Sequence, residues 1–200
     1  MKGSLIIVGF FILGVIAGAA GWLSIDKTGF DISFAALACL MFCVGLGVGN
    51  DLGALRALRT LPKMLLTLPL LTITGTLAGC ALIALLLPWR PLTDVLAVGS
   101  GFGYYSLSSI FITEYRGPEL GTVALLANIV REIITLLGAP LLARFFGPLA
   151  PVSSGGATSM DTTLPIITRV SGKEFVILSI YHGFVVDFSV PFLVTFFCSL

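Results

Sequence analysis

The sequence predicts an all-α integral membrane protein of about seven spans, two of which are broken helices. Of the 200 residues, 57% are hydrophobic and only 10% are charged. Charge-free runs of 23, 19 and 26 residues, at positions 3–25, 32–50 and 64–89, are each close to or above the ~20 residues that cross a bilayer. Two glycine- and hydroxyl-rich stretches interrupt the apolar sequence further on. We expect a single transmembrane transporter domain over residues 1–200, with no room for a soluble domain.

The individual spans follow from the apolar runs and from the connectors between them. Connectors rich in proline, glycine or charge occur at residues 24–30, 88–91, 116–118 and 171–173. They divide the chain into five plain helices and two broken ones. We predict plain helices over about 4–23, 31–49, 63–87, 119–146 and 174–199, and broken helices over about 93–115 and 148–169.

The two interruptions are the most informative feature of the chain. Residues 98–109 read VGSGFGYYSLSS, and residues 153–165 read SSGGATSMDTTLP. In hydrocarbon every backbone N–H and C=O group needs a partner, so such stretches persist only where they are packed in protein or line a cavity. Pairs of broken helices hold the solute near the midplane in several transporter folds. The pattern predicts a transporter with breaks near residues 101–105 and 155–161.

Asp161, inside the second break, is the sharpest candidate for a binding site. A charge at this depth is costly and is usually offset by a cavity, a counter-ion or protonation. We expect its carboxylate to alternate between a proton and a cationic substrate, with Thr158 and Ser159 in the same site. An alternative interpretation makes Asp161 the N-cap of a half-helix that starts at Thr162. The two roles can coexist.

Three polar residues, Asn128, Arg131 and Glu132, lie in the middle of the span predicted over about 119–146. Their spacings of three and four residues allow them to share one broad helix face. Arg131 and Glu132 point about 100° apart, so each is expected to meet a polar partner on a broken segment rather than lipid. The three residues can form a structural network that braces the breaks, or Glu132 can face the substrate path.

The first break combines hydroxyl groups with glycines. Ser100 and Ser106 offer hydroxyls, while Gly101 and Gly103 allow close approach of the backbone. Free N–H groups at the start of a half-helix suit an anionic group such as a carboxylate. Such glycines also serve close helix packing, and Tyr105 can line the path or merely pack.

Two ionisable residues lie near the middle of the last predicted span. His182 can relay protons, or it can be a hydrogen-bonded structural group. Asp187 is equally open to a functional or a structural interpretation. We include only His182 among the candidate site residues.

Composition argues against several classes of function. A net charge of +1 argues against nucleic acid as a partner. Four cysteines without a CxxC pair, and a single histidine, predict neither a metal site nor a disulfide framework. The sequence has no ATP-binding motif and no set of nucleophile, base and metal ligands. We therefore expect no enzyme and no cofactor, with transport drawing on ion gradients or an outside motor.

Basic residues predict a cytoplasmic N-terminus and an outside C-terminus. With seven full crossings, seven basic residues lie inside and three outside. The inside group is Lys2, Arg56, Arg59, Lys63, Arg116, Arg169 and Lys173, and the outside group is Lys27, Arg90 and Arg144. This topology requires segment 148–169 to cross the membrane fully.

Four motifs in this order resemble the LysO-type lysine exporter family. They are SGFGYYSLS at residues 100–108, Asn128 followed by Arg131 and Glu132, GATSMDTTLP at residues 156–165, and HGF at residues 182–184. The resemblance covers nearly the whole chain. It implies a fold related to cation/proton antiporter-like transporters with inverted repeats and crossed broken helices. It also implies export of L-lysine and close analogues across a bacterial or archaeal cytoplasmic (inner) membrane, by exchange with protons.

Many members of that family carry further spans before the point that corresponds to Met1. We therefore expect the larger, C-terminal part of a split exporter, or else a shortened chain. A split exporter implies a small membrane subunit as a partner, besides lysine, protons and lipid. The charge-free faces of the helices over about 4–23 and 31–49 are its candidate docking surfaces. Two alternatives are a cation/proton or other small amino-acid or organic-acid transporter of the same fold, and a non-transporting membrane subunit.

A lysine site makes a geometric prediction. The two breaks should approach each other near mid-membrane, with Asp161 facing a polar cavity shared with residues 100–109. The backbone around residues 101–106 would then hold the substrate carboxylate.

Overall fold

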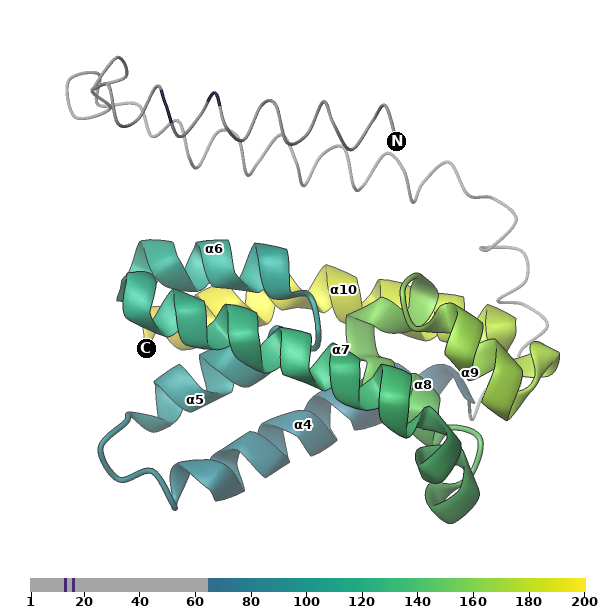
Figure 1. Cartoon of the computed structure of the whole chain (residues 1–200). Coiled ribbons are helices and arrows are strands. Elements are labelled where there is room, and N and C mark those ends of the chain that lie inside the picture. Colours follow the sequence, from purple (N-terminus) through teal and green to yellow (C-terminus); the bar gives the residue numbers. More distant parts are fainter. Residues whose placement is uncertain (1–12, 14–15, 17–64) are drawn as a thin grey trace. The chain divides into compact units, whose positions relative to one another are not determined.

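The computed structural model describes residues 65–200, together with Leu13 and Ile16, which are helical and exposed. Apart from these two positions, the predicted spans over about 4–23 and 31–49 lie outside the described residues. Residues 65–200 are folded entirely from helices and connecting turns, with no strand (Figure 1). This agrees with the predicted all-α fold, while a single domain over residues 1–200 stays a prediction.

In the described part, three helices are long and apolar enough to cross a membrane. They are α4 (Leu68–Ala84), preceded by η3 (Leu65–Thr67); α7 (Pro118–Phe146); and α10 (Val176–Ser199), preceded by η5 (Lys173–Phe175). Large apolar side chains point outward from them, such as Leu137, which is 78% exposed, and Phe188, which is 62% exposed. Soluble proteins rarely expose so much apolar surface, so this outer face suits lipid. The plain helices predicted over about 63–87, 119–146 and 174–199 are confirmed.

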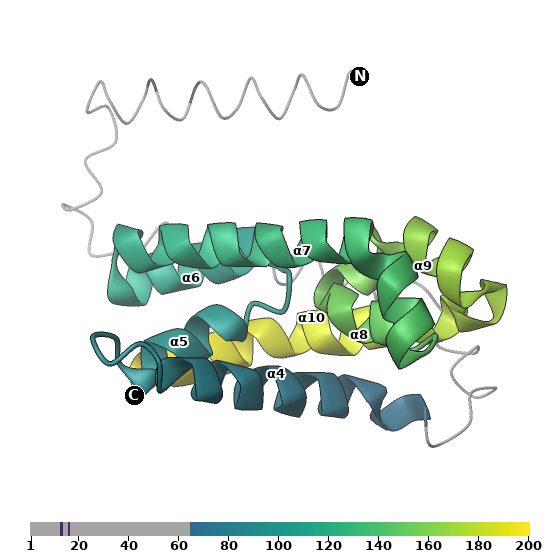
Figure 2. The same cartoon turned by 60° about the horizontal axis from the view of Figure 1, so that its bottom comes forward.

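The first broken segment enters the helix bundle and returns to the end from which it came. α5 (Leu92–Gly99) runs inward, the chain turns through residues 100–104, and α6 (Tyr105–Arg116) runs back. All views show α5 and α6 in the same half of the bundle (Figure 2). The segment is a re-entrant hairpin rather than a crossing.

Ion pairs tie the entrance and the exit of this first hairpin together. Arg90, before α5, pairs with Glu119 at the start of α7. Arg116, at the end of α6, lies with its Nη1 3.7 Å from Asp94 Oδ1 in the first turn of α5. The Nε of Arg116 also donates a hydrogen bond to the carbonyl of Cys198, 3.1 Å away at the end of α10. All five residues therefore lie at one end of the bundle.

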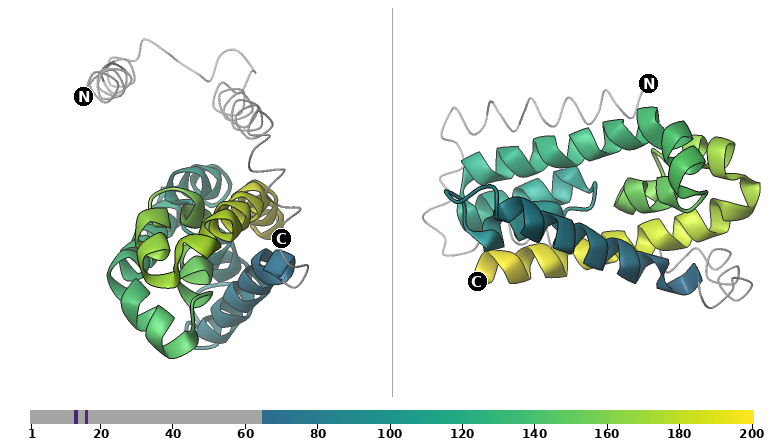
Figure 3. Two further views of the ribbon diagram at one scale, coloured as in Figure 1. Left: turned by 90° about the vertical axis from the view of Figure 1, so that its right-hand side faces the viewer. Right: turned by 90° about the horizontal axis from the view of Figure 1, so that it is seen from below.

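The second broken segment is also a hairpin, and it enters from the opposite end. It consists of α8 (Ala150–Gly155), η4 (Gly156–Met160) and α9 (Leu164–Ser171), all in the other half of the bundle (Figure 3). An apolar cluster joins its two limbs, Val152 on α8 and Ile167 on α9, to Leu68 of α4 and Leu178 of α10. Entrance and exit therefore share one end here as well.

Full crossings by these two segments, as predicted, are wrong. At 1.5 Å per residue, the eight residues of α5 extend about 12 Å and the six of α8 about 9 Å. The hydrocarbon core is about 30 Å thick, so each inward limb ends inside it. The positions of the breaks are confirmed. The antiporter-like fold, and with it the inverted repeat, stays a prediction.

The hairpins also change the predicted placement of two basic residues. Arg116 lies at the same end as Arg90, not at the opposite end, because α6 returns. Arg144, at the end of α7, lies at the other end together with Arg169 of α9. Removing two crossings leaves the C-terminus on its predicted side, so the N-in, C-out orientation stays a prediction.

Candidate functional site

The tips of the two hairpins meet in the middle of the bundle through a backbone hydrogen bond. The N–H of Ala157 donates to the carbonyl of Phe102 at 2.9 Å. Phe102 is fully buried and has a φ of +46°, a region that bulky residues rarely adopt. Gly156 has a φ of +61°, and a Cβ there would collide with the Phe102 carbonyl. The predicted approach of the two breaks is confirmed, and it depends on a bare glycine backbone.

Asn128 of α7 holds the first break. Its Oδ1 accepts a hydrogen bond from the N–H of Gly103 at 2.7 Å. Its Nδ2 donates to the carbonyl of Val98 at 3.3 Å and to that of Ala124 at 2.9 Å. A Cβ at Gly101 would collide with this amide, so the glycine permits the contact. The amide thus satisfies backbone groups that the interruption leaves without helical partners.

Arg131, one turn further along α7, holds the second break. Its Nε donates to the carbonyl of Ser154 at 3.0 Å, and its Nη2 donates to that of Ser153 at 3.1 Å. These carbonyls lie at the C-terminal end of α8, where a positive charge complements the helix dipole. The guanidinium carbon lies 6.0 Å from the centroid of the Phe102 ring. The prediction that Arg131 contacts a broken segment rather than lipid is confirmed.

The hydroxyl groups of the second break are bonded to one another and to neighbouring helices. Thr158 Oγ1 donates to the Gly155 carbonyl at 3.0 Å and lies 3.3 Å from Thr163 Oγ1. Ser159 Oγ lies 3.0 Å from Nδ1 of His182, while Nε2 of His182 lies 2.9 Å from Oγ1 of Thr72 on α4. His182 is fully buried and hydrogen-bonded through both ring nitrogens, so it joins α10, η4 and α4.

The remaining candidates of the first break have separate surroundings. Ser100 is buried, and its hydroxyl donates back to the carbonyl of Leu96 at 2.7 Å. Tyr105 and Ser106 are exposed on the first turn of α6. The structure therefore brings Gly101 and Gly103 into the crossing and leaves the other three at its edge.

Asp161 is exposed, and its side chain bonds only to its neighbour Thr162 within the described residues. Its Oδ1 accepts hydrogen bonds from the N–H of Thr162 at 2.5 Å and from the hydroxyl of Thr162 at 3.2 Å. Helix α9 begins at Leu164 with Thr163 as its N-cap residue, so the predicted half-helix starting at Thr162 is wrong. Asp161 has no hydrogen bond to residues 100–109, and a cavity shared with them stays a prediction.

Sequence reasoning left Asp187 undecided, and the structure makes it a further candidate. Asp187 is 8% exposed, and its side chain has no hydrogen bond or ion pair within residues 65–200. Asp187 is close enough to Asp161 for the two carboxylates to interact electrostatically. Both carboxylates are also within electrostatic range of Tyr104, beside the first break. The signal in the sequence is a carboxylate within an otherwise uncharged span.

Glu132 departs from the expectation that every charge on α7 finds a polar partner. It is half-buried, and it has no hydrogen bond or ion pair within the described part of the chain. A role for Glu132 in the substrate path stays a prediction. Over the same residues, no group of three or more histidine, cysteine, aspartate and glutamate side chains could hold a metal ion.

Comparison with known proteins identifies close relatives. The model of the family described as lysine exporter LysO matches residues 8–198. The chain is 34% identical over 196 residues to the lysine exporter LysO of Escherichia coli (strain K12), covering 98% of this chain and 64% of that protein. It is 33% identical over 190 residues to a putative lysine exporter of Haemophilus influenzae (strain Rd), covering 94% of each. The chain thus spans about 64% of the length of its E. coli relative. No solved structure matches it.

Proposed function

The chain belongs to the lysine exporter LysO family, and on this basis we propose that it exports L-lysine and close analogues from the cytoplasm. It acts as a secondary transporter of the cytoplasmic membrane that exchanges lysine for protons. Its relatives are named as transporters, in keeping with a role other than catalysis. A small membrane subunit as partner is part of the same proposal, and it would co-purify with a tagged chain.

The observation that carries this proposal is the meeting of two hairpin tips beside carboxylates without a counter-ion. Asp187 and Glu132 have no ion-pair partner within residues 65–200, and over the same residues the side chain of Asp161 bonds only to Thr162. Uncompensated carboxylates in a membrane span are expensive, so they are expected to serve a cation or a proton. The ammonium groups of lysine fit this requirement.

Exchange with protons follows from the energetics of moving a cation outward. Moving one positive charge against an interior-negative potential costs about 2.3 kcal/mol per 100 mV. Return of one proton cancels the net charge moved, so the pH gradient can drive export. In this scheme Asp161 binds the ammonium group on one side and the proton on the other, with Asp187 as its buried neighbour. His182 positions η4, because both of its ring nitrogens are already hydrogen-bonded.

The test is transport of labelled lysine by the full chain in liposomes, with and without a pH gradient. We expect export to follow the gradient and Asp161→Asn to abolish it. Glu174→Gln removes an exposed carboxylate at the membrane edge and should transport normally. Lysine transport that ignores the gradient would contradict the exchange, and full export by Asp161→Asn would remove the role of its carboxylate. An exchanger of monovalent cations would be indifferent to lysine.

A further inference from the structure

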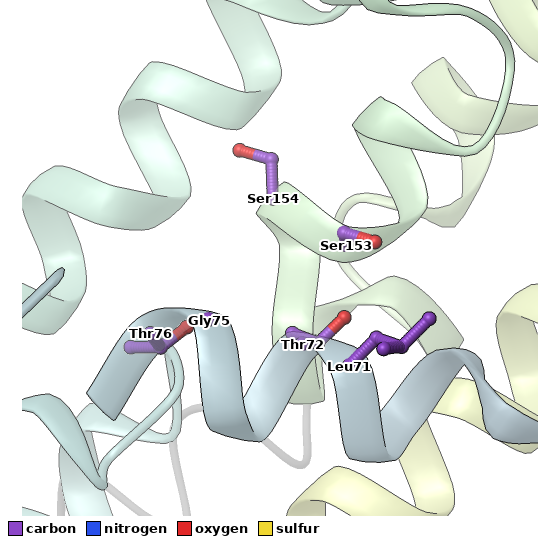
Figure 4. A pocket seen from close by; sticks show the side chains of 6 residues that line it. All are labelled: Leu71, Thr72, Gly75, Thr76, Ser153 and Ser154. Atoms are coloured by element: carbon purple, nitrogen blue, oxygen red, sulfur yellow. The ribbon is translucent and has the colours of Figure 1, made fainter. Parts of the chain in front are cut away.

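A hollow of about 310 Å³ lies between α4 and α8, beside the second break (Figure 4). This volume is at the lower end of the range for small-molecule sites. Four of the six residues that line it carry hydroxyl groups. The lining residues are Leu71, Thr72, Gly75, Thr76, Ser153 and Ser154.

Arg131 lies next to this hollow, because it bonds to three of the residues that line it. The Nη1 of Arg131 donates to Oγ1 of Thr76, 3.4 Å away, while its other bonds go to the carbonyls of Ser153 and Ser154. Every one of these acceptors is neutral, and within residues 65–200 no carboxylate lies within 4.0 Å of Arg131. A partly buried cation without a counter-ion is costly, so a bound anion would stabilise it.

The hydrogen bonds also fix the direction in which the hydroxyl of Thr76 can donate. A guanidinium has five N–H donors and no acceptor, so the oxygen of Thr76 must accept the bond from Arg131. The hydroxyl hydrogen of Thr76 is then available to a ligand. Three of the five guanidinium N–H groups are used in the described structure, and the other two have no hydrogen bond there.

We propose that this hollow binds the α-carboxylate of the amino acid that the protein transports. Arg131 supplies the charge, and the hydroxyls of Thr76 and Ser153 supply further donors. The inference rests on the proposed export of lysine. It places the carboxylate away from the first break, because the N–H of Gly103 there already donates a hydrogen bond to Asn128. Recognition of the carboxylate then separates amino acids from simple diamines.

The experiment compares ligands that differ only at one end of lysine. Proteoliposomes containing the full chain exchange labelled L-lysine against unlabelled L-lysine, L-lysinamide or 1,5-diaminopentane. We expect lysine to compete at least about tenfold better than the two ligands without a carboxylate, since a hydrogen bond to a charged group is worth about that factor or more. Thr76→Val keeps the side-chain shape and removes the hydroxyl. This variant should weaken competition by lysine about tenfold and leave competition by the other two ligands unchanged.

Matched variants separate binding from folding. Thr74→Val alters an exposed threonine of α4 that bonds only within its own helix, and it should behave as the wild type. Ser153→Ala should act like Thr76→Val. Equal competition by lysine and lysinamide in the wild type, or undiminished discrimination in both hollow variants, would overturn the carboxylate site.

A binding measurement distinguishes failure of this inference from failure of the proposed function. L-norleucine has the carboxylate of lysine but lacks its side-chain amine. Thermal stabilisation of the detergent-solubilised protein by norleucine, and its loss in Thr76→Val, would support the hollow even if lysine export were absent. Lysine export with no stabilisation by norleucine would refute the hollow and leave the proposed function intact.

Discussion

The two interrupted segments meet at their tips, yet their polar groups are satisfied in different ways. In the first break, the neutral amide of Asn128 bonds the backbone, and the hydroxyls of Ser100 and Ser108 donate back to their own helices. In the second, the guanidinium of Arg131 on α7 and the imidazole of His182 on α10 bond to residues of the break. The first break is held by neutral groups alone, whereas the second is held in part by a charged one.

This difference suggests a division of labour between the hairpins. The first hairpin presents a fixed backbone surface, with Phe102 as its contact to the second. The second hairpin lies beside the hollow and contains Asp161. The following variants test whether the two breaks differ in this way.

The largest effect is expected from Gly156→Ala in the second break. A side chain there is strained by the φ of +61° and collides with the Phe102 carbonyl. We expect a loss of about 3 kcal/mol or more in the free energy of unfolding, seen as a large drop in thermal stability in detergent. Gly138→Ala in α7 is the control, since a Cβ there meets nothing within 4 Å. Equal stability of the two variants would show that the tips do not need to touch.

A smaller effect is expected from Asn128→Ala in the first break. The change leaves the N–H of Gly103 without its side-chain acceptor, which should cost about 1–3 kcal/mol in unfolding free energy. Thermal unfolding measures the loss, with Thr122→Ala as an exposed control on the same helix. A change as small as that of the control would mean that the first break is satisfied without α7.

The smallest effects on the unfolding free energy are expected from serine-to-alanine changes, one in each break. Ser106 is exposed, and its replacement by alanine should alter the unfolding free energy by less than about 0.5 kcal/mol. Ser159 is buried and bonded to His182, so Ser159→Ala should cost about 1 kcal/mol or more. The two melting curves measure this directly. A larger loss at Ser106 would reverse the proposed division between the breaks.

Local sequence predicted where the helices break, but not the direction in which the chain leaves. Glycines and hydroxyl residues indicate an interruption wherever they occur in an apolar run, and both breaks were placed within a few residues. Segment 93–115 is as long as a full crossing, so length alone favours one. The reversal brings together residues distant in sequence, such as Arg90 and Glu119, and a pattern of residues does not reveal such contacts.

The candidate site was predictable for the same local reasons and only to the same extent. Helical spacing put Asn128 and Arg131 on one face, and both do turn inward. Which break each one serves depends on how the hairpins dock against α7. In the sequence, Thr72 and Thr76 are indistinguishable from other helix residues. They line a hollow only because α8 packs beside α4.

The spacing of Asn128 and Arg131 on α7 has a mechanical consequence. Sliding α7 by a single residue moves its side chains 1.5 Å along the axis, which is enough to break the 2.7 Å bond to Gly103 and the 3.0 Å bond to Ser154 together. Neither hairpin can therefore shift along α7 without losing its hydrogen bond to that helix. We expect the two tips and α7 to move as one rigid body.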